Sequence, residues 1–152
     1  MDLSKIVQEI QYVLAPAVMI SSSALLLLGF QNKFSSLANR FRALNQERRT
    51  LSQKLDRNNP ENERLRNLKA QVDHLIQRAA HVKNAILLMY VAIMCFVATS
   101  IFLFLNIYMH FQFSYLAIMF FLIGLVLVFV VSASIMIEVA LSFKVLDLES
   151  KL

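Results

Sequence analysis

Residues 31–84 read QNKFSSLANRFRALNQERRTLSQKLDRNNPENERLRNLKAQVDHLIQRAAHVKN. This stretch carries twelve of the fifteen lysine and arginine residues against five acids, a local charge of +7, whereas the rest of the chain sums to −2. One long apolar segment precedes the stretch and two follow it. A basic segment set between apolar ones is typical of a polytopic membrane protein, so this stretch decides how the chain is organised.

Apolar residues within the stretch recur at alternating spacings of three and four. The first series comprises Phe34, Leu37, Phe41, Leu44, Leu51 and Leu55, with Arg48 where one apolar residue is missing. The second series comprises Leu65, Leu68, Val72, Leu75, Ala79 and Val82. Such spacing is a heptad pattern, which keeps one seam of a helix facing a partner.

A turn signal separates the two series. Asn59 can cap a helix, Pro60 fits its first turn, and Glu61 suits the positive end of its dipole. The two series therefore predict two helices that fold back about residues 59 and 60 as an antiparallel coiled-coil hairpin.

Folding about this turn sets the register of the seam. Leu44 falls opposite Leu75, and Arg48 falls beside Asp73. We expect an ion pair between Arg48 and Asp73, with the arginine stem lying on the apolar seam. A solvated Arg48 is the alternative, because exposed ion pairs contribute only about 0 to 1 kcal/mol.

The whole chain has 152 residues, of which 58% are hydrophobic, and a mean hydropathy of +0.59. A membrane-spanning helix needs about 20 apolar residues, and three stretches approach or exceed this length. The predicted fold is an all-α integral membrane protein with three transmembrane helices. Its expected segments are an interfacial helix at 1–12, span one at 13–30, the hairpin at 31–84, span two at 85–107, span three at 113–143 and a tail at 144–152.

The first residues form a short amphipathic pattern. One helical face carries Leu3, Ile6, Val7, Ile10 and Leu14, and polar residues occupy the rest. This pattern predicts a short helix that lies in the membrane surface. The segment lacks a basic start and a small-residue cleavage site, so we expect it to be retained.

The basic residues also predict the topology. Loops rich in lysine and arginine stay in the cytoplasm, which places the hairpin and the C-terminus inside and the N-terminus outside. Tyr12, Tyr108 and Tyr115 would then lie at the outer interface, where amphipathic rings prefer to be.

Span one contains three consecutive serines near its middle, Ser21, Ser22 and Ser23. They could bond back to carbonyls of their own helix or line a polar pore. Ala17, Ser21 and Ala24 also form a small-residue face suited to close contact between helices.

Glu138 is the only acid within an apolar run. Ser134, Glu138 and Ser142 are four residues apart and share one face of span three. The ends of the other spans provide Lys33, Lys83 and Asn84 as partners of Glu138. A carboxylate in a span is costly and usually faces a partner or water, so we weigh an interhelical salt bridge, an ion or proton relay, and interfacial snorkelling.

The sequence contains no motif typical of catalysis, metal binding or nucleotide binding. The chain lacks a phosphate-binding loop, a metal-binding His-Glu motif and a nucleophile elbow, so we expect no enzyme, no cofactor and no metal site. His74 and His81, seven residues apart, fit solvated side chains better than metal ligands. Cys95 is the single cysteine and lies in an apolar run. The basic stretch alternates with acids and lacks aromatic stacking partners, which argues against nucleic-acid binding.

Four short motifs stand out along the chain: APAVMIS at 15–21, LLLLG at 25–29, QN at 31–32 and FRALNQER at 41–48. Glu138 is followed by Leu141 and Ser142. In these motifs the chain resembles an uncharacterised bacterial family known as the domain of unknown function number 2721. The resemblance covers nearly the whole chain and implies a bacterial inner-membrane protein with three spans. It implies no activity and no catalytic residues.

Two functions fit these observations. The first is a homo-oligomeric assembly in the lipid bilayer that conducts ions or protons, supported by the hairpin, the serine cluster and Glu138. The second is a non-conducting structural or regulatory module whose cytoplasmic hairpin docks a protein partner, supported by the lack of a continuous polar stripe through any span.

Overall fold

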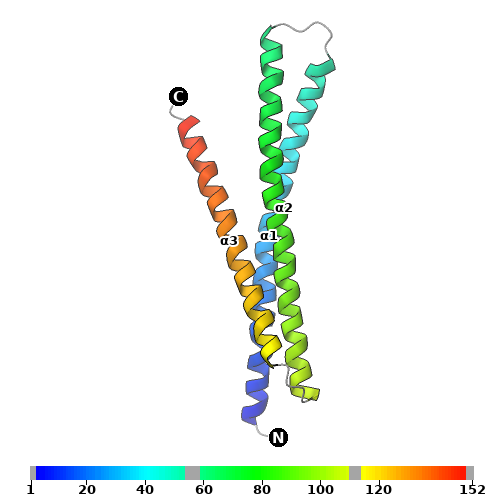
Figure 1. Cartoon of the computed structure of the whole chain (residues 1–152), viewed down its shortest axis with the longest axis vertical. Helices are drawn as coiled ribbons and strands as arrows, with labels where there is room; N and C mark the ends of the chain where they lie inside the picture. Colours follow the sequence, from blue (N-terminus) through cyan, green and yellow to red (C-terminus); the bar gives the residue numbers. More distant parts are fainter. Residues whose placement is uncertain (1–2, 54–58, 110–113, 150–152) are drawn as a thin grey trace. The chain divides into compact units, whose positions relative to one another are not determined.

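The fold is a set of long helices (Figure 1). A computed structural model describes residues 3–53, 59–109 and 114–149. Helix α1 runs from Leu3 to Gln53, α2 from Asn59 to Met109, and α3 from Ser114 to Glu149. The predicted all-α class is therefore confirmed for the described residues.

Each helix contains a segment that is long and apolar enough to cross a membrane. These segments fall within Ile10–Gln53, Pro60–Ile107 and Ser114–Ala140. Because a span needs about 20 residues, each helix meets the requirement. The prediction of three span-forming helices is confirmed by length and composition.

Two compact units divide the chain. Unit 1 comprises Met1–Leu28 together with Ala85–Leu152, and unit 2 comprises Gly29–Asn84. Unit 1 therefore holds most of the apolar residues, and unit 2 holds most of the charged ones.

Unit 2 consists of two antiparallel helical arms, the second half of α1 and the first half of α2 (Figure 1). The α2 arm turns its apolar series inward, with Leu68, Val72, Leu75 and Val82 all buried. The arms are joined by an ion pair in which Nε and Nη2 of Arg64 donate to Oε1 of Glu47, at 2.9 and 2.6 Å. Coiled-coil packing in the strict sense stays a prediction.

The register of the arms differs from the predicted one. The observed ion pair joins Glu47 to Arg64, whereas Arg48 and Asp73 form none with each other. In the predicted register Glu47 lies opposite residues 72 and 73, which are eight to nine residues beyond Arg64. Because long side chains reach along the helix, the apolar register nearest to this ion pair is displaced by seven residues, which is one heptad.

A displacement of one heptad keeps apolar residues opposite apolar residues. We infer from it that Leu44 lies at the level of Leu68 and Leu37 at the level of Leu75, in place of the predicted pairing of Leu44 with Leu75. Leu55 lies outside the described residues. The remaining predicted seam residues of the α1 arm are half-buried, except for Phe34, which is just exposed; Leu65 and Ala79 of the α2 arm are half-buried too.

The beginning of α1 also differs from the expectation. The predicted interfacial helix is not a separate element, because residues from Leu3 onward belong to the same helix as span one. Pro16 lies inside this helix. Proline removes one backbone hydrogen bond, yet membrane helices tolerate it when neighbouring groups compensate, and Pro16 is fully buried.

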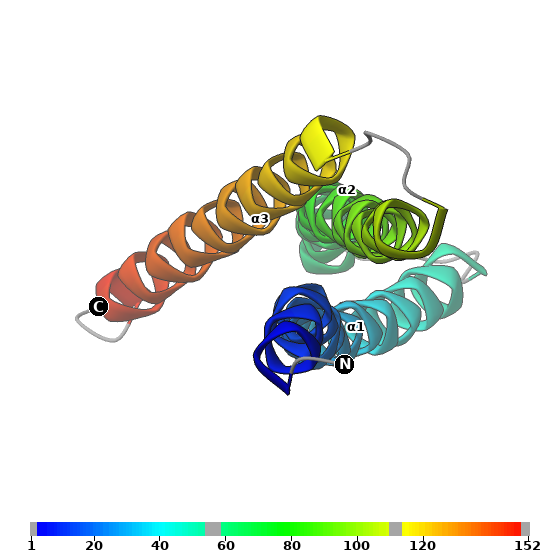
Figure 2. The ribbon, with the colours of Figure 1, turned by 90° about the horizontal axis from the view of Figure 1, so that it is seen from below.

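Unit 1 is held together by small residues around one large ring. Phe96 of α2 is fully buried, and Gly124 of α3 lies directly against it. The rings of Phe96 and Phe121 lie with their centroids 5.7 Å apart and their planes tilted by 59°. Seen from below, the three helices of this unit do not lie in one row (Figure 2).

Candidate functional site

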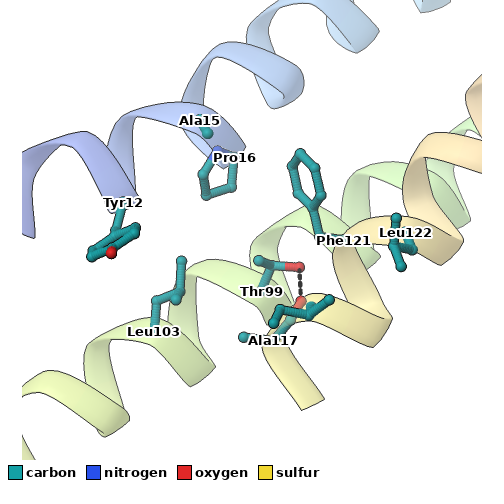
Figure 3. Close-up of a pocket in the computed structure, with 9 residues that line it drawn as sticks. Tyr12, Ala15, Pro16, Thr99, Leu103, Ala117, Phe121 and Leu122 are labelled. Atoms are coloured by element: carbon teal, nitrogen blue, oxygen red, sulfur yellow. Dashed lines mark hydrogen bonds between the residues drawn. The ribbon is translucent and has the colours of Figure 1, made fainter. Parts of the chain in front are cut away.

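One hollow of unit 1 is a groove to which all three helices contribute (Figure 3). Its volume is about 180 Å³. The residues that line it are Tyr12, Ala15 and Pro16 of α1, Thr99 and Leu103 of α2, and Ala117, Ile118, Phe121 and Leu122 of α3. Two of the lining residues, Ala15 and Ala117, have small side chains that leave space between the helices.

Among the described lining residues of α2 and α3, Thr99 is the one with a hydroxyl group, and this hydroxyl already forms hydrogen bonds within the protein. Its Oγ1 donates to the carbonyl of Cys95 in the same helix at 2.9 Å. A longer contact of 3.4 Å reaches the carbonyl of Ala117 in α3 (Figure 3). The hydroxyl therefore links two helices, and the groove wall that it belongs to is apolar in character.

The far wall of the groove is fixed by aromatic packing. Phe121 lines the groove and leans on the buried ring of Phe96, which in turn contacts Gly124. An aromatic pair of this kind contributes about 0.5–1.5 kcal/mol beyond the area it buries. The wall is therefore part of the helix packing and not a loose side chain.

The lining determines what the groove can hold. Among the described residues that line it, Tyr12 is the one titratable side chain, and none is a carboxylate, lysine, arginine, histidine or cysteine. Among the described residues no group of three metal-ligating side chains occurs. A charged or strongly polar ligand would lose its hydration in this groove without gaining partners, so the arrangement suits an apolar group.

The three predicted serines point in different directions. Ser21 Oγ donates to the carbonyl of Ala17 at 3.2 Å, and Ser22 Oγ donates to the carbonyl of Met19 at 3.1 Å. Both side chains are exposed on the surface of unit 1. Ser23 is 0% exposed, and its hydroxyl has no hydrogen-bond partner within the described part of the chain. The structure does not gather the three hydroxyls at one point.

The predicted polar face of α3 is described in part. Ser134 is exposed and donates to the carbonyl of Val130 at 2.8 Å, which satisfies its hydroxyl within its own helix. Glu138 is half-buried, with both carboxylate oxygens shielded from solvent. The side chain of Ser142 lies outside the described residues.

The expected partners of Glu138 belong to the other compact unit. Lys33 is half-buried, and Lys83 and Asn84 are exposed. All three are in unit 2, whereas Glu138 is in unit 1. Their pairing with Glu138 stays a prediction.

The hairpin carries a basic strip on its α1 arm. Arg42, Gln46 and Arg49 are exposed at spacings of four and three, so they share one face of the helix. Together with half-buried Asn45 they line a shallow polar hollow. Neither arginine has an ion-pair partner among the described residues. His74 and His81 are both exposed on the other arm.

Sequence reasoning missed the groove and the glycine contact behind it. A groove formed by Ala15 and Ala117 between three apolar helices leaves no motif, because its lining has no reactive group. A usable signal was present in Gly124, since glycine in a helix interior costs about 0.5–1 kcal/mol relative to alanine and is kept where another group comes close.

Comparison with known proteins gives one match. Residues 13–148 match the family described as "Protein of unknown function (DUF2721)". No curated protein and no solved structure shows a significant match. Since the match covers far more than half of the 152 residues, the chain belongs to the DUF2721 family.

Proposed function

We propose that this protein is a non-enzymatic, multi-pass protein of the bacterial inner membrane whose cytoplasmic hairpin docks a protein partner. The observation that carries the proposal is unit 2. Gly29–Asn84 form a compact unit with a buried seam of their own, and the charged faces on either side of that seam stay exposed. A paired helical arm of this kind presents a surface and no reaction centre.

The topology of the proposal rests on charge. Three crossings place the hairpin and the C-terminus on one side and the N-terminus on the other. Twelve basic residues against five acids in residues 31–84 favour the cytoplasm for the hairpin. Reporter fusions at the hairpin turn and in the link between α2 and α3 test this, and a hairpin turn found outside the cell would refute the proposal.

The basic strip favours an acidic partner over a second hairpin. Arg42 and Arg49 are seven residues apart, which at 1.5 Å per residue is about 10.5 Å along the helix. They match acids at the same spacing on a partner helix. A second copy of the hairpin would bring another local charge of +7, and like charges of this size repel. We therefore place the partner-binding surface on this strip.

Copies of the chain would instead meet through the spans. Ala17, Ser21 and Ala24 of α1 are all exposed, so no helix within the described residues covers this face. Small residues allow close approach of helices in lipid, where packing and not water exclusion drives association. A homo-oligomer held at this face is compatible with docking by the hairpin.

Ion or proton conduction is the second candidate, and Glu138 favours it. An acid half-buried in an otherwise uncharged span is costly, and such acids often belong to ion pathways. The serines argue against it, since Ser21, Ser22 and Ser134 each donate to their own helix and do not form a polar stripe.

The two candidates are separated by ion flux in liposomes containing the purified full-length protein. If the protein is a docking module, its liposomes should show the same flux of protons, Na⁺ and K⁺ as liposomes without protein. A conducting assembly gives flux that Glu138→Gln abolishes and that Ser134→Ala, on the same helix face, leaves intact. That second outcome would refute the docking proposal.

A positive test of docking uses a photo-crosslinking residue in living cells in place of Gln46, the exposed uncharged residue of the strip between Arg42 and Arg49. We expect one discrete heteromeric product, lost when Arg42 is reversed to glutamate. A crosslinker in place of exposed Lys69 on the other arm is the matched control. Equal products from both arms, or only adducts between copies of this chain, would contradict the assignment of the surface.

A further inference from the structure

The groove between the three helices of unit 1 is open toward the outside of the unit. Two of its lining residues, Ile118 and Leu122, are 57% and 54% exposed. Their neighbours Met119 and Ile123 on the same helix are exposed apolar residues too. All of these residues belong to the segment of α3 that is apolar enough to span a membrane. The groove is therefore continuous with the surface that faces lipid.

We propose that the acyl chain of a membrane lipid occupies this groove as a retained ligand of the protein. The lining is apolar, and the hydroxyl of Thr99 is already bonded within the protein. Nothing in such a lining recognises an ion, a sugar or a nucleotide. A hydrocarbon chain meets no polar group there that it would leave without a partner.

The size of the groove fits part of one chain. The volume of about 180 Å³ is far above the roughly 10–15 Å³ that one water molecule requires in a cavity, so several methylene groups can enter the groove. The rest of the chain would continue along the exposed residues of α3. Tyr12, at one end of span one, marks the end near the membrane interface, where the headgroup of the lipid would emerge.

Retention comes from packing. Lipid tails are as apolar as leucine, so burial from water contributes nothing inside a bilayer. A wall fixed by Phe121 and Phe96 instead offers dispersion contacts that an empty groove would lose. The occupant therefore exchanges more slowly than lipid on the smooth faces of the helices.

The test is native mass spectrometry of the full-length protein released from nanodiscs that contain a single phosphatidylcholine. We expect one retained lipid per chain. Ala15→Phe fills the groove and lowers retention at least fivefold, whereas Val18→Phe leaves it unchanged. Both residues are exposed on the same helix three positions apart, but only Ala15 lines the groove, and Val18 is not part of the small-residue face.

Three outcomes overturn the proposal: no lipid retained by the wild type, equal retention by the two variants, or equal loss in both. Ala15→Leu repeats the test with a smaller side chain if Ala15→Phe does not fold. The chain contains no tryptophan, so a single introduced tryptophan provides an independent fluorescence measurement. Ile118→Trp should be quenched by brominated lipid, and the quenching should persist after exchange into unbrominated lipid longer than for Met136→Trp, an exposed residue of the same helix.

Discussion

Gly124 is the position where one added methyl group meets a ring that cannot move away. A Cβ atom built there would lie 2.8 Å from Cε1, 3.0 Å from Cζ and 3.1 Å from Cδ1 of Phe96. Phe96 is 0% exposed and packs against Phe121 on another side. Gly124→Ala therefore forces either the ring or the backbone of α3 to shift. Gly29 is the matched control, because a Cβ atom at Gly29 would meet nothing within 4 Å.

The size of the effect follows from two opposing terms. Alanine is favoured over glycine in a helix interior by about 0.5–1 kcal/mol, and both positions gain this. Overpacking of a tight site costs about 1–3 kcal/mol, and only Gly124 suffers it. The difference between the two alanine variants isolates the steric cost. Because 1.4 kcal/mol is a factor of ten, the expected difference in the unfolding equilibrium is about 5- to 150-fold.

Cys95 provides the assay. It is the single cysteine of the chain, it is 8% exposed, and it lies in the core of unit 1. A thiol-reactive dye labels it when unit 1 opens. Gly124→Ala should be labelled faster than Gly29→Ala in the same lipid, and Phe96→Leu should restore slow labelling to the Gly124→Ala variant. If the two alanine variants were labelled at the same rate, the close contact inferred between α2 and α3 would be wrong.

Two further predictions concern unit 2. Reversing Glu47 to arginine or Arg64 to glutamate should lower the free energy of unfolding of the hairpin, and reversing both should restore it. Because the side chains of Glu47 and Arg64 are 38% and 67% exposed, each reversal should change this free energy by about 0.2–1 kcal/mol. Unfolding followed by circular dichroism should show the change at low salt and not in 1 M salt. In a background without the native cysteine, Leu44→Cys should form a disulfide with Leu68→Cys but not with Leu75→Cys, as read by gel mobility under oxidation; the opposite preference would restore the register predicted from the sequence.

The helices were accessible to sequence reasoning because each local signal agreed with the others. Pro60 and Glu61 lie in the first turn of α2, which begins at Asn59. The span-forming segments follow from apolar length alone, since nothing else fills a bilayer. An amphipathic pattern over residues 3–14 fits both a surface helix and the first turns of a longer one, and α1 is continuous from Leu3 onward.

The register of the hairpin could not be read from its pattern. A heptad repeat looks the same after a displacement of seven residues, so Leu44 can face either Leu68 or Leu75 with an apolar partner. Charge pairs can distinguish these two registers only when the length of the turn between the arms is known. The observed contact between Glu47 and Arg64 belongs to one register and the expected contact between Arg48 and Asp73 to the other.

The polar residues of the spans show a similar limit. Successive residues of a helix point about 100° apart, so Ser21, Ser22 and Ser23 necessarily face three directions. The sequence says that one of them can be buried, but it does not say which. Packing places Ser23 inside unit 1 and leaves the other two on its surface. The groove depends on small side chains from three helices at once, so no single stretch encodes it.

The division into two compact units has a thermodynamic consequence. When the hairpin opens, its buried seam becomes exposed to water; the seam comprises Leu68, Val72, Leu75 and Val82. Exposure of apolar surface to water raises the heat capacity of the unfolded hairpin, so both cooling and heating destabilise the folded hairpin. The contacts around Phe96 would open into hydrocarbon instead of water, so their opening would not raise the heat capacity in this way. A calorimetric scan of the protein in nanodiscs should therefore resolve two events, and cooling should loosen the hairpin long before it disturbs the helices in the bilayer.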